Sequence, residues 1–177
     1  MQVGCAADRP VNENRTVLKP HIAVIGSGEA TEVEASLAGR VGAILADAGA
    51  VVISGGLGGV MSASCEAAFH RGGTTVGLLP GSDRAAGNPF LTVALPTGLG
   101  EMRNGLVVAV ADAIIAVGGG WGTLNEIALA MRVGKPLVAI QSWDVESPPH
   151  QSVQPLTVAQ SPEEAVRLAL AMIRFHT

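Results

Sequence analysis

The residues best placed to do chemistry lie in one short run that follows an apolar segment. Residues 113–117 are apolar, and the next nine positions read Gly-Gly-Gly-Trp-Gly-Thr-Leu-Asn-Glu. A strand, a glycine-rich turn and a helix N-terminus in this order present backbone N–H groups and the positive end of the helix dipole, which together bind anions such as phosphate. The candidate binding residues of this turn are Gly118, Gly119, Gly120, Trp121, Gly122 and Thr123.

Glu126 adds a carboxylate about one turn into the expected helix. Phosphate binding alone does not need a carboxylate, so Glu126 indicates either catalysis or recognition of a ribose. Trp121 is equally compatible with stacking on a base or pterin ring and with a half-buried cover over the turn. The run is not a Walker A motif, because no Gly-Lys-Ser/Thr follows. It is not a GxGxxG fingerprint either, because the acidic residue lies in the adjacent helix.

Two more glycine turns follow apolar runs earlier in the chain. The first is equally compatible with a tight turn and with ligand contact, whereas the second has more glycine and polar positions than a turn requires. The second therefore favours contact with a phosphate or a ribose. The candidate residues are Gly26, Ser27 and Gly28 in the first turn, and Ser54, Gly55, Gly56, Gly59 and Met61 in and after the second.

These turns need a sheet to bring them together. Apolar runs predict strands at 21–25, 50–53, 74–79, 90–95, 113–117, 135–140 and 156–159. Helical periodicity and capping residues predict helices at 31–48, 60–70, 101–110, 124–133 and 161–175. This alternation predicts an α/β fold, a single Rossmann-like doubly wound parallel sheet with helices on both faces. Ligands bind at the carboxyl ends of such strands, and all three glycine turns would lie on that edge.

Arg103 is the only basic residue between Arg84 and Arg132. It stands at the start of a predicted helix, where a cation opposes the helix dipole. An anionic partner and an ordinary solvent-facing arginine explain this position equally well. Asn104 follows it and could donate or accept a hydrogen bond beside it.

Composition restricts the function classes further. The chain has 177 residues, of which 48% are hydrophobic, and predicts one domain at 21–177 after a flexible tail at 1–20. A net charge of −4 argues against a large nucleic-acid footprint. The two cysteines and four histidines show no disulfide or metal-ligand spacing, so we expect no metal and a reducing cytoplasm. No signal peptide or membrane-spanning run is found, and no membrane partner is expected.

Three motifs together resemble the LOG superfamily: residues 54–61, Met102-Arg103-Asn104, and residues 119–126. That superfamily includes cytokinin-activating phosphoribohydrolases, molybdenum cofactor carrier proteins and relatives of the DNA-processing protein A. The resemblance extends from about residue 21 to residue 140. It implies that Arg103 and Glu126 would be the catalytic pair of a hydrolase that cleaves an N-glycosidic bond without a cofactor. Glu126 would orient water or stabilise an oxocarbenium-like centre, and Arg103 would bind phosphate or polarise the leaving base.

Two positions depart from the hydrolase pattern, because Asn104 replaces a lysine and Gly118 replaces a proline. The combination instead resembles the carrier branch and its bacterial relatives. The leading hypothesis is therefore a cytoplasmic protein that binds a small phosphorylated ligand, a nucleotide monophosphate or a pterin such as the molybdenum cofactor. The alternative is a phosphoribohydrolase acting on a purine or cytokinin nucleoside 5′-monophosphate, and single-stranded DNA binding comes third. The resemblance also implies a homo-oligomer, a dimer or larger.

Overall fold

A computed structural model describes residues 18–145 and 156–173. Most of the predicted tail and of the predicted loop at 141–154 lies outside these residues, as do the last four positions. The described part forms one seven-stranded, fully parallel sheet in the order β4-β3-β2-β1-β5-β6-β7. The strands are β1 (His21–Gly26), β2 (Val51–Ser54), β3 (Thr74–Leu79), β4 (Val93–Pro96), β5 (Ala113–Val117), β6 (Leu137–Ile140) and β7 (Thr157–Val158).

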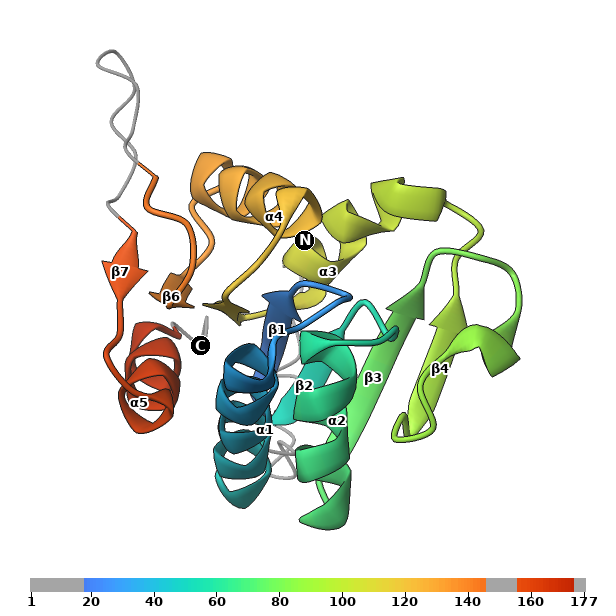
Figure 1. Cartoon of the computed structure of the whole chain (residues 1–177), viewed down its shortest axis with the longest axis horizontal. Helices are drawn as coiled ribbons and strands as arrows, with labels where there is room; N and C mark the ends of the chain where they lie inside the picture. Colours follow the sequence, from blue (N-terminus) through green and yellow to red (C-terminus); the bar gives the residue numbers. More distant parts are fainter. Residues whose placement is uncertain (1–17, 146–155, 174–177) are drawn as a thin grey trace, which may run out of the picture.

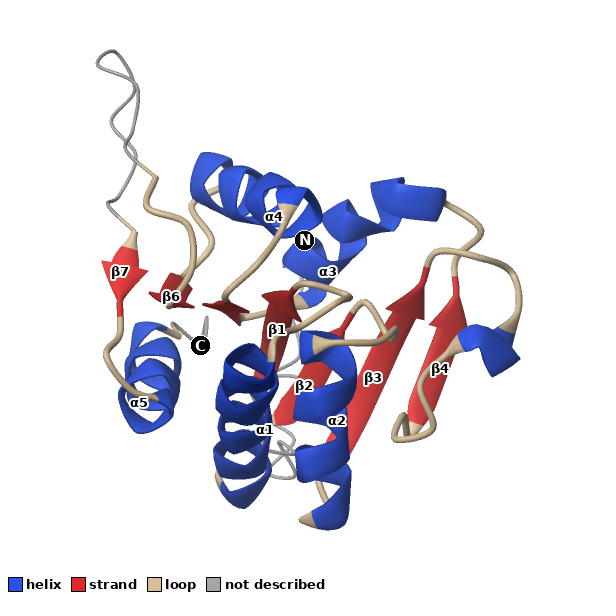
Figure 2. Ribbon diagram, in the orientation of Figure 1, coloured by secondary structure: helices blue, strands red, loops and turns tan. Residues whose placement is uncertain are grey.

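Helices cover both faces of this sheet (Figures 1 and 2). One face packs against α1 (Glu32–Asp47), α2 (Val60–His70) and α5 (Pro162–Met172), and the other against α3 (Asn104–Val110) and α4 (Trp121–Arg132). The central strands are apolar at nearly every position because both of their faces are buried. In β5, for example, all five residues are buried, and Ile114 and Ile115 point to opposite faces. The predicted α/β class is confirmed.

The strand order reverses between β1 and β5, which are neighbours at the centre of the sheet. Gly26, the last residue of β1, pairs with Val117, the last residue of β5. From β1 the chain proceeds outward through β2, β3 and β4, and then returns through α3 to β5 on the other side. Such a reversal opens a crevice at the carboxyl ends of the strands. The three glycine turns follow β2, β1 and β5, so they share this edge as the sequence predicts.

Helices α1 and α2 pack closely because small residues face one another. An added Cβ at Gly42 would lie 2.8 Å from the carbonyl carbon of Ser64 in α2. At Gly39, one helical turn earlier, the nearest atom would be the carbonyl oxygen of Ala63 at 3.7 Å, which is an ordinary contact. The close approach of the two helices therefore depends on Gly42 and not on Gly39.

Replacing Gly42 with alanine is expected to lower the free energy of unfolding by about 2 kcal/mol, because the new methyl group meets rigid backbone. Gly39→Ala is the matched control, since it adds the same methyl group to the same helix. It should be neutral or raise stability by up to about 1 kcal/mol through helix propensity. Urea unfolding of the two variants checks this, and equal effects would contradict the packing described.

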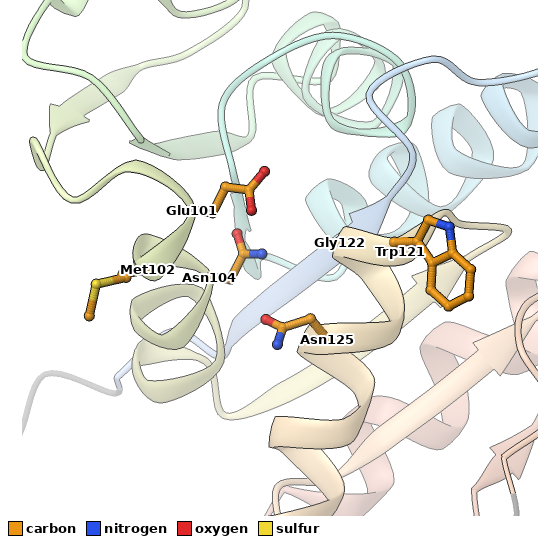
Figure 3. Close-up of a pocket in the computed structure, with 6 residues that line it drawn as sticks. All are labelled: Glu101, Met102, Asn104, Trp121, Gly122 and Asn125. Carbon is orange, nitrogen blue, oxygen red and sulfur yellow. The ribbon is translucent and has the colours of Figure 1, made fainter.

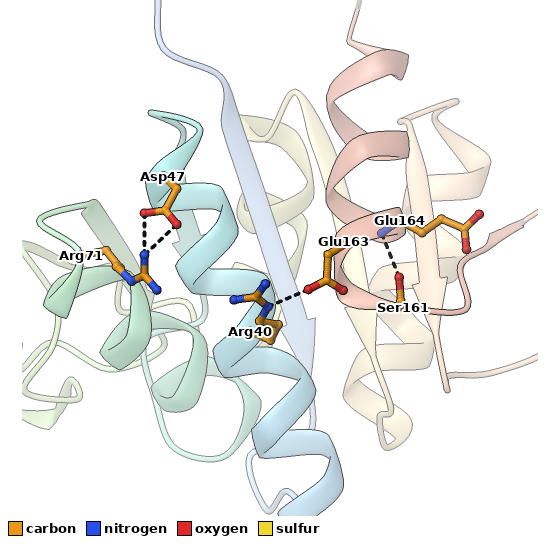
Figure 4. A network of polar contacts seen from close by, with 6 residues as sticks. All are labelled: Arg40, Asp47, Arg71, Ser161, Glu163 and Glu164. Atoms are coloured by element: carbon orange, nitrogen blue, oxygen red, sulfur yellow. Dashed lines mark hydrogen bonds and ion pairs between the residues drawn. The ribbon is translucent and has the colours of Figure 1, made fainter.

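Ion pairs at the surface join α1 to the end of α2 and to α5 (Figure 4). Arg71, which directly follows α2, contacts Asp47 of α1 at 2.9 Å, and Arg40 of α1 contacts Glu163 of α5 at 2.7 Å. All four side chains are about half exposed, so the pairs contribute little to stability. The first turn of α5 is fixed by its N-cap Ser161, whose hydroxyl accepts a hydrogen bond from the N–H of Glu164.

Two elements near the crevice differ from the prediction. Helix α4 begins at Trp121, three residues earlier than expected, so Gly122 and Thr123 lie in its first turn. The predicted helix at 101–110 is a 3₁₀ turn, η2 (Gly100–Arg103), followed by the short helix α3. Gly100 has a φ of 58°, which does not belong to an α-helix. None of the described helices is both long and apolar enough to cross a membrane.

Candidate functional site

The turn after β5 presents open backbone donors. Gly120 caps α4 without any side-chain hydrogen bond. The first helical bond runs from the N–H of Leu124 to the carbonyl of Gly120. Within the described residues, the N–H groups of Trp121, Gly122 and Thr123 have no acceptor, because the first turn of a helix has no intrahelical partners for them and Gly120 has no side chain to supply one.

Glycine is required in this turn by the backbone. Gly118 has a φ of 54°, a conformation that proline, with φ near about −65°, does not adopt. The proline that the hydrolase pattern has at this position would therefore not fit the backbone of this turn. Gly119 has a φ of 126°, and an added Cβ there would lie 2.6 Å from the Cβ of Thr123. Thr123 is therefore buried against the turn and is not the N-cap of α4.

Arg103 is buried, with only 8% of its surface exposed. The interpretation of this residue as an ordinary solvent-facing arginine is therefore wrong. Its Nη1 donates to the side-chain oxygen of Asn104 and lies 3.9 Å from Oε1 of Glu126. Its Nε is buried and has no partner in the described part of the chain. A buried guanidinium with an unused N–H group can donate a hydrogen bond to an additional anionic partner.

Glu126 forms the other half of this pair and is 6% exposed. Burial raises the pKa of its carboxyl to about 7, although the positive charge of Arg103 acts in the opposite direction. Burial also lowers the pKa of Arg103, against the attraction of Glu126 and Glu101. A carboxyl with a pKa near neutrality can both accept and donate a proton under physiological conditions.

The second glycine turn lies against Arg103. An added Cβ at Gly55 would be 2.5 Å from Nη2 of Arg103 and 2.8 Å from Sδ of Met61, so glycine leaves the space for both side chains. Met61 also approaches Gly28 of the first turn. The structure thus brings the first turn, the second turn and α4 together around Met61 and Arg103.

The serine hydroxyls of these turns are engaged inside the protein. Ser54 is fully buried, and its hydroxyl accepts a hydrogen bond from the N–H of Gly56 and contacts the Sγ of Cys65. Ser27 hydrogen-bonds through its hydroxyl with the backbone of Glu29. In this structure the hydroxyl groups of Ser27 and Ser54 are therefore used for contacts inside the protein. The ligand contacts predicted for these two residues would have to come from other atoms.

A pocket of about 390 Å³ opens between η2 and the N-terminus of α4. Its lining residues are Glu101, Met102, Asn104, Trp121, Gly122 and Asn125. Figure 3 shows Glu101, Asn104 and Asn125 pointing toward the gap between the two elements, while the ring of Trp121 turns to the other side of α4. The pocket therefore offers backbone N–H groups of α4 together with amide and carboxylate side chains.

The ring of Trp121 lies on a second tryptophan. Trp121 is 79% exposed, and its ring centroid is 5.5 Å from that of Trp143. The indole N–H of Trp143 donates to the carbonyl of Gly120 at 3.2 Å and so supports the turn. Sequence reasoning missed Trp143, because it lies in a polar connecting segment without periodicity. It also missed Glu101, Met102 and Asn125, although Met102 and Asn125 stand inside the motifs singled out.

Comparison with known proteins agrees with this architecture. The chain is 39% identical to an uncharacterized protein from Archaeoglobus fulgidus over 150 residues, which are 85% of this chain and 94% of that protein. The structure of the molybdenum cofactor binding protein from Rippkaea orientalis matches with a TM-score of 0.78 and 30% identity, covering 89% of this chain and 99% of that one. The molybdenum cofactor carrier protein from Chlamydomonas reinhardtii matches with a TM-score of 0.74 and 30% identity, covering 88% and 100%.

The family assignment rests on a match along most of the chain. The model of the SLOG cluster4 family, within the LOG superfamily, matches residues 19–166. This range includes all three glycine turns, Arg103 and Glu126. The protein therefore belongs to the SLOG cluster4 family.

Proposed function

We propose that this protein is a cytoplasmic binder of a small phosphorylated ligand whose phosphate is held by the N-terminus of α4. The observation that carries the proposal is the open first turn of α4, where the N–H groups of Trp121, Gly122 and Thr123 have no acceptor in the described residues. This turn borders the pocket of about 390 Å³, a volume within the range of small-molecule sites.

The remaining part of the ligand is proposed to be a nitrogen heterocycle. Asn104, Asn125 and Glu101 point into the same gap and supply both donors and acceptors. A pterin or purine carries amino and carbonyl groups on one edge, which such side chains can recognise. The residues present therefore fit a phosphorylated pterin, and the two solved relatives named above are a binder and a carrier of the molybdenum cofactor. For this chain we propose binding of that cofactor or of a nucleoside monophosphate.

A phosphoribohydrolase activity is a second candidate, and the near-neutral pKa of Glu126 favours it. In that reaction water adds to the anomeric carbon, the N-glycosidic bond breaks, and the base leaves with a proton. Glu126 would exchange the proton, and Arg103 would stabilise the developing negative charge. Glu126 is buried and is not among the residues that line the pocket, so the reaction requires the ligand to reach deeper than the open gap.

A fluorescence titration tests the proposed binding. The sequence contains two tryptophans and no tyrosine, so its intrinsic fluorescence reports on Trp121 and Trp143 beside α4. We expect guanosine 5′-monophosphate, whose guanine shares the amino-carbonyl edge of a pterin, to change this emission at millimolar concentration or below. No change with this nucleotide or with molybdopterin, and none in a calorimetric titration, would contradict the binding proposal.

Chromatography of the same mixtures tests the hydrolase. A carrier leaves the nucleotide intact, whereas a hydrolase releases free guanine. If guanine appears, Glu126→Gln should still bind but no longer release it, because the amide cannot exchange the proton. Equal release by both proteins would exclude Glu126 from that reaction.

We further propose that the protein associates with copies of itself. Met102, Leu106 and Val110 are spaced four residues apart along η2 and α3, and all three are exposed. This apolar stripe is suited to burial against a second copy. Sedimentation at micromolar concentration is expected to show a dimer or larger species.

A further inference from the structure

The carboxylate of Glu34 connects the N-terminus of α1 with the glycine turn after β5. Glu34 lies in the first turn of α1, which follows β1. Its Oε1 accepts a hydrogen bond from the N–H of Gly119 at 3.2 Å, across 85 residues of sequence. Its Oε2 accepts hydrogen bonds from the backbone N–H and the hydroxyl of Thr31, at 2.8 and 2.9 Å. Glu34 therefore joins the start of α1 to the turn that leads into α4.

The turn after β5 is shaped around this carboxylate. An added Cβ at Gly118 would overlap Oε1 of Glu34 and would lie 2.5 Å from its Cδ. Gly118 also has the positive φ that glycine favours. The position and conformation of Gly118 thus leave room for Glu34, and any larger residue at this position would displace it.

The carboxylate takes a position that suits the oxygen of an anionic ligand. The N–H of Gly119 and the open N–H groups of the first turn of α4 belong to one strand–turn–helix connection, the arrangement that binds phosphates in α/β proteins. Of these donors, Gly119 is the one already satisfied, and its acceptor is a negatively charged side chain. Hydrogen bonds from Thr31 and Gly119 also lower the pKa of Glu34, which keeps it ionised.

We propose that Glu34 is an internal competitor for the anion site, occupying the N–H of Gly119 in the free protein and opposing a phosphate bound at α4. This inference rests on the proposed function, because it assigns a specificity-determining residue to the same site. Its physical basis is the repulsion between two like charges at one helix N-terminus. Glu34 therefore weakens phosphate binding, and a protein that must pass on its ligand gains easier release.

The test compares three proteins by calorimetry with inorganic phosphate and with guanosine 5′-monophosphate. Glu34→Gln removes the charge but retains an oxygen that can accept from Gly119. Glu32→Gln is the matched control, because Glu32 is an exposed acidic residue of the same helical turn without a hydrogen bond in the described residues. We expect Glu34→Gln to bind both probes about tenfold more tightly than the wild type, and Glu32→Gln to stay within about twofold.

Glu34→Asp provides a second variant with the charge retained. Its side chain is one methylene shorter and no longer reaches Gly119, so we expect an affinity between those of the wild type and Glu34→Gln. Far-UV circular dichroism verifies that each variant is folded. Equal or weaker binding by Glu34→Gln, with wild-type binding intact, overturns the role of Glu34 and leaves the proposed function standing. Absence of binding to both probes in all variants overturns both.

Discussion

Replacing Arg103 with methionine is expected to weaken nucleotide binding about 100-fold and to lower the free energy of unfolding by about 3 kcal/mol at pH 8. Methionine fills a similar volume but leaves the Glu126 carboxylate buried without its positive partner, which lies 3.9 Å away in the native protein. It also removes the cation that faces Gly55 in the second turn. Urea unfolding and fluorescence titration with guanosine 5′-monophosphate measure the two effects.

The stability cost of this variant should depend on pH. Arg103 lowers the pKa of Glu126, so this pKa rises further in the variant and the carboxyl takes up a proton instead of remaining charged. The loss at pH 6 is therefore expected to be smaller than the loss at pH 8. The double variant Arg103→Met/Glu126→Gln is the control, because it removes both charges and should recover much of the lost stability at pH 8. A double variant as unstable as the single one would contradict this coupling.

Replacing Glu126 with glutamine is expected to raise the stability of the protein at pH 8 by about 3 kcal/mol. In the folded protein burial raises the pKa of Glu126 to about 7, whereas the ordinary value is 4.5. Between these values the folded state holds a proton that the unfolded state has lost. The contribution of Glu126 is therefore favourable at low pH and is lost as the pH rises from about 4.5 to about 7.

The difference in the free energy of unfolding between the wild type and Glu126→Gln isolates the contribution of the Glu126 carboxyl. Glutamine resembles the protonated carboxyl, so the wild type and Glu126→Gln should be about equally stable at pH 4.5. Their free energies of unfolding should then separate up to about pH 7 and run parallel above it. Urea unfolding at several pH values measures how this difference changes with pH. A wild type that gains stability relative to the variant as the pH rises would show that Arg103 outweighs burial.

The arrangement of the glycine turns could be predicted because local signals and the rules for parallel sheets agree. The apolar runs ending at Ile25, Ile53 and Val117 are each followed by glycines, and right-handed crossovers bring such ends to one edge. The predicted start of α4 was wrong because Gly122 suggests a turn. A glycine in a helix costs only about 1 kcal/mol relative to alanine, so Gly122 does not prevent the helix from beginning earlier. Thr123, the next residue, packs against Gly119 in this first turn.

The contacts between distant segments could not be predicted. The spacing of Thr31 and Glu34 is a capping-box signal, and the box is present, but nothing local connects Glu34 with Gly119. The burial of Arg103 could not be predicted, because its ion-pair partner Glu126 lies 23 positions later in another helix. Such contacts arise from the crossover geometry of the sheet. Charge and periodicity therefore identified Arg103 and Glu126 separately, and the fold places them together.

The most direct test of the central claim is a map of backbone amide resonances during titration with guanosine 5′-monophosphate. Binding of the phosphate at the N-terminus of α4 predicts the largest shifts for the amides of Trp121, Gly122 and Thr123. Helix α5 (Pro162–Met172), which packs on the far side of the sheet from α4, should remain unchanged. Absence of shifts at millimolar nucleotide, or shifts that leave residues 121–123 unaffected, would contradict the account.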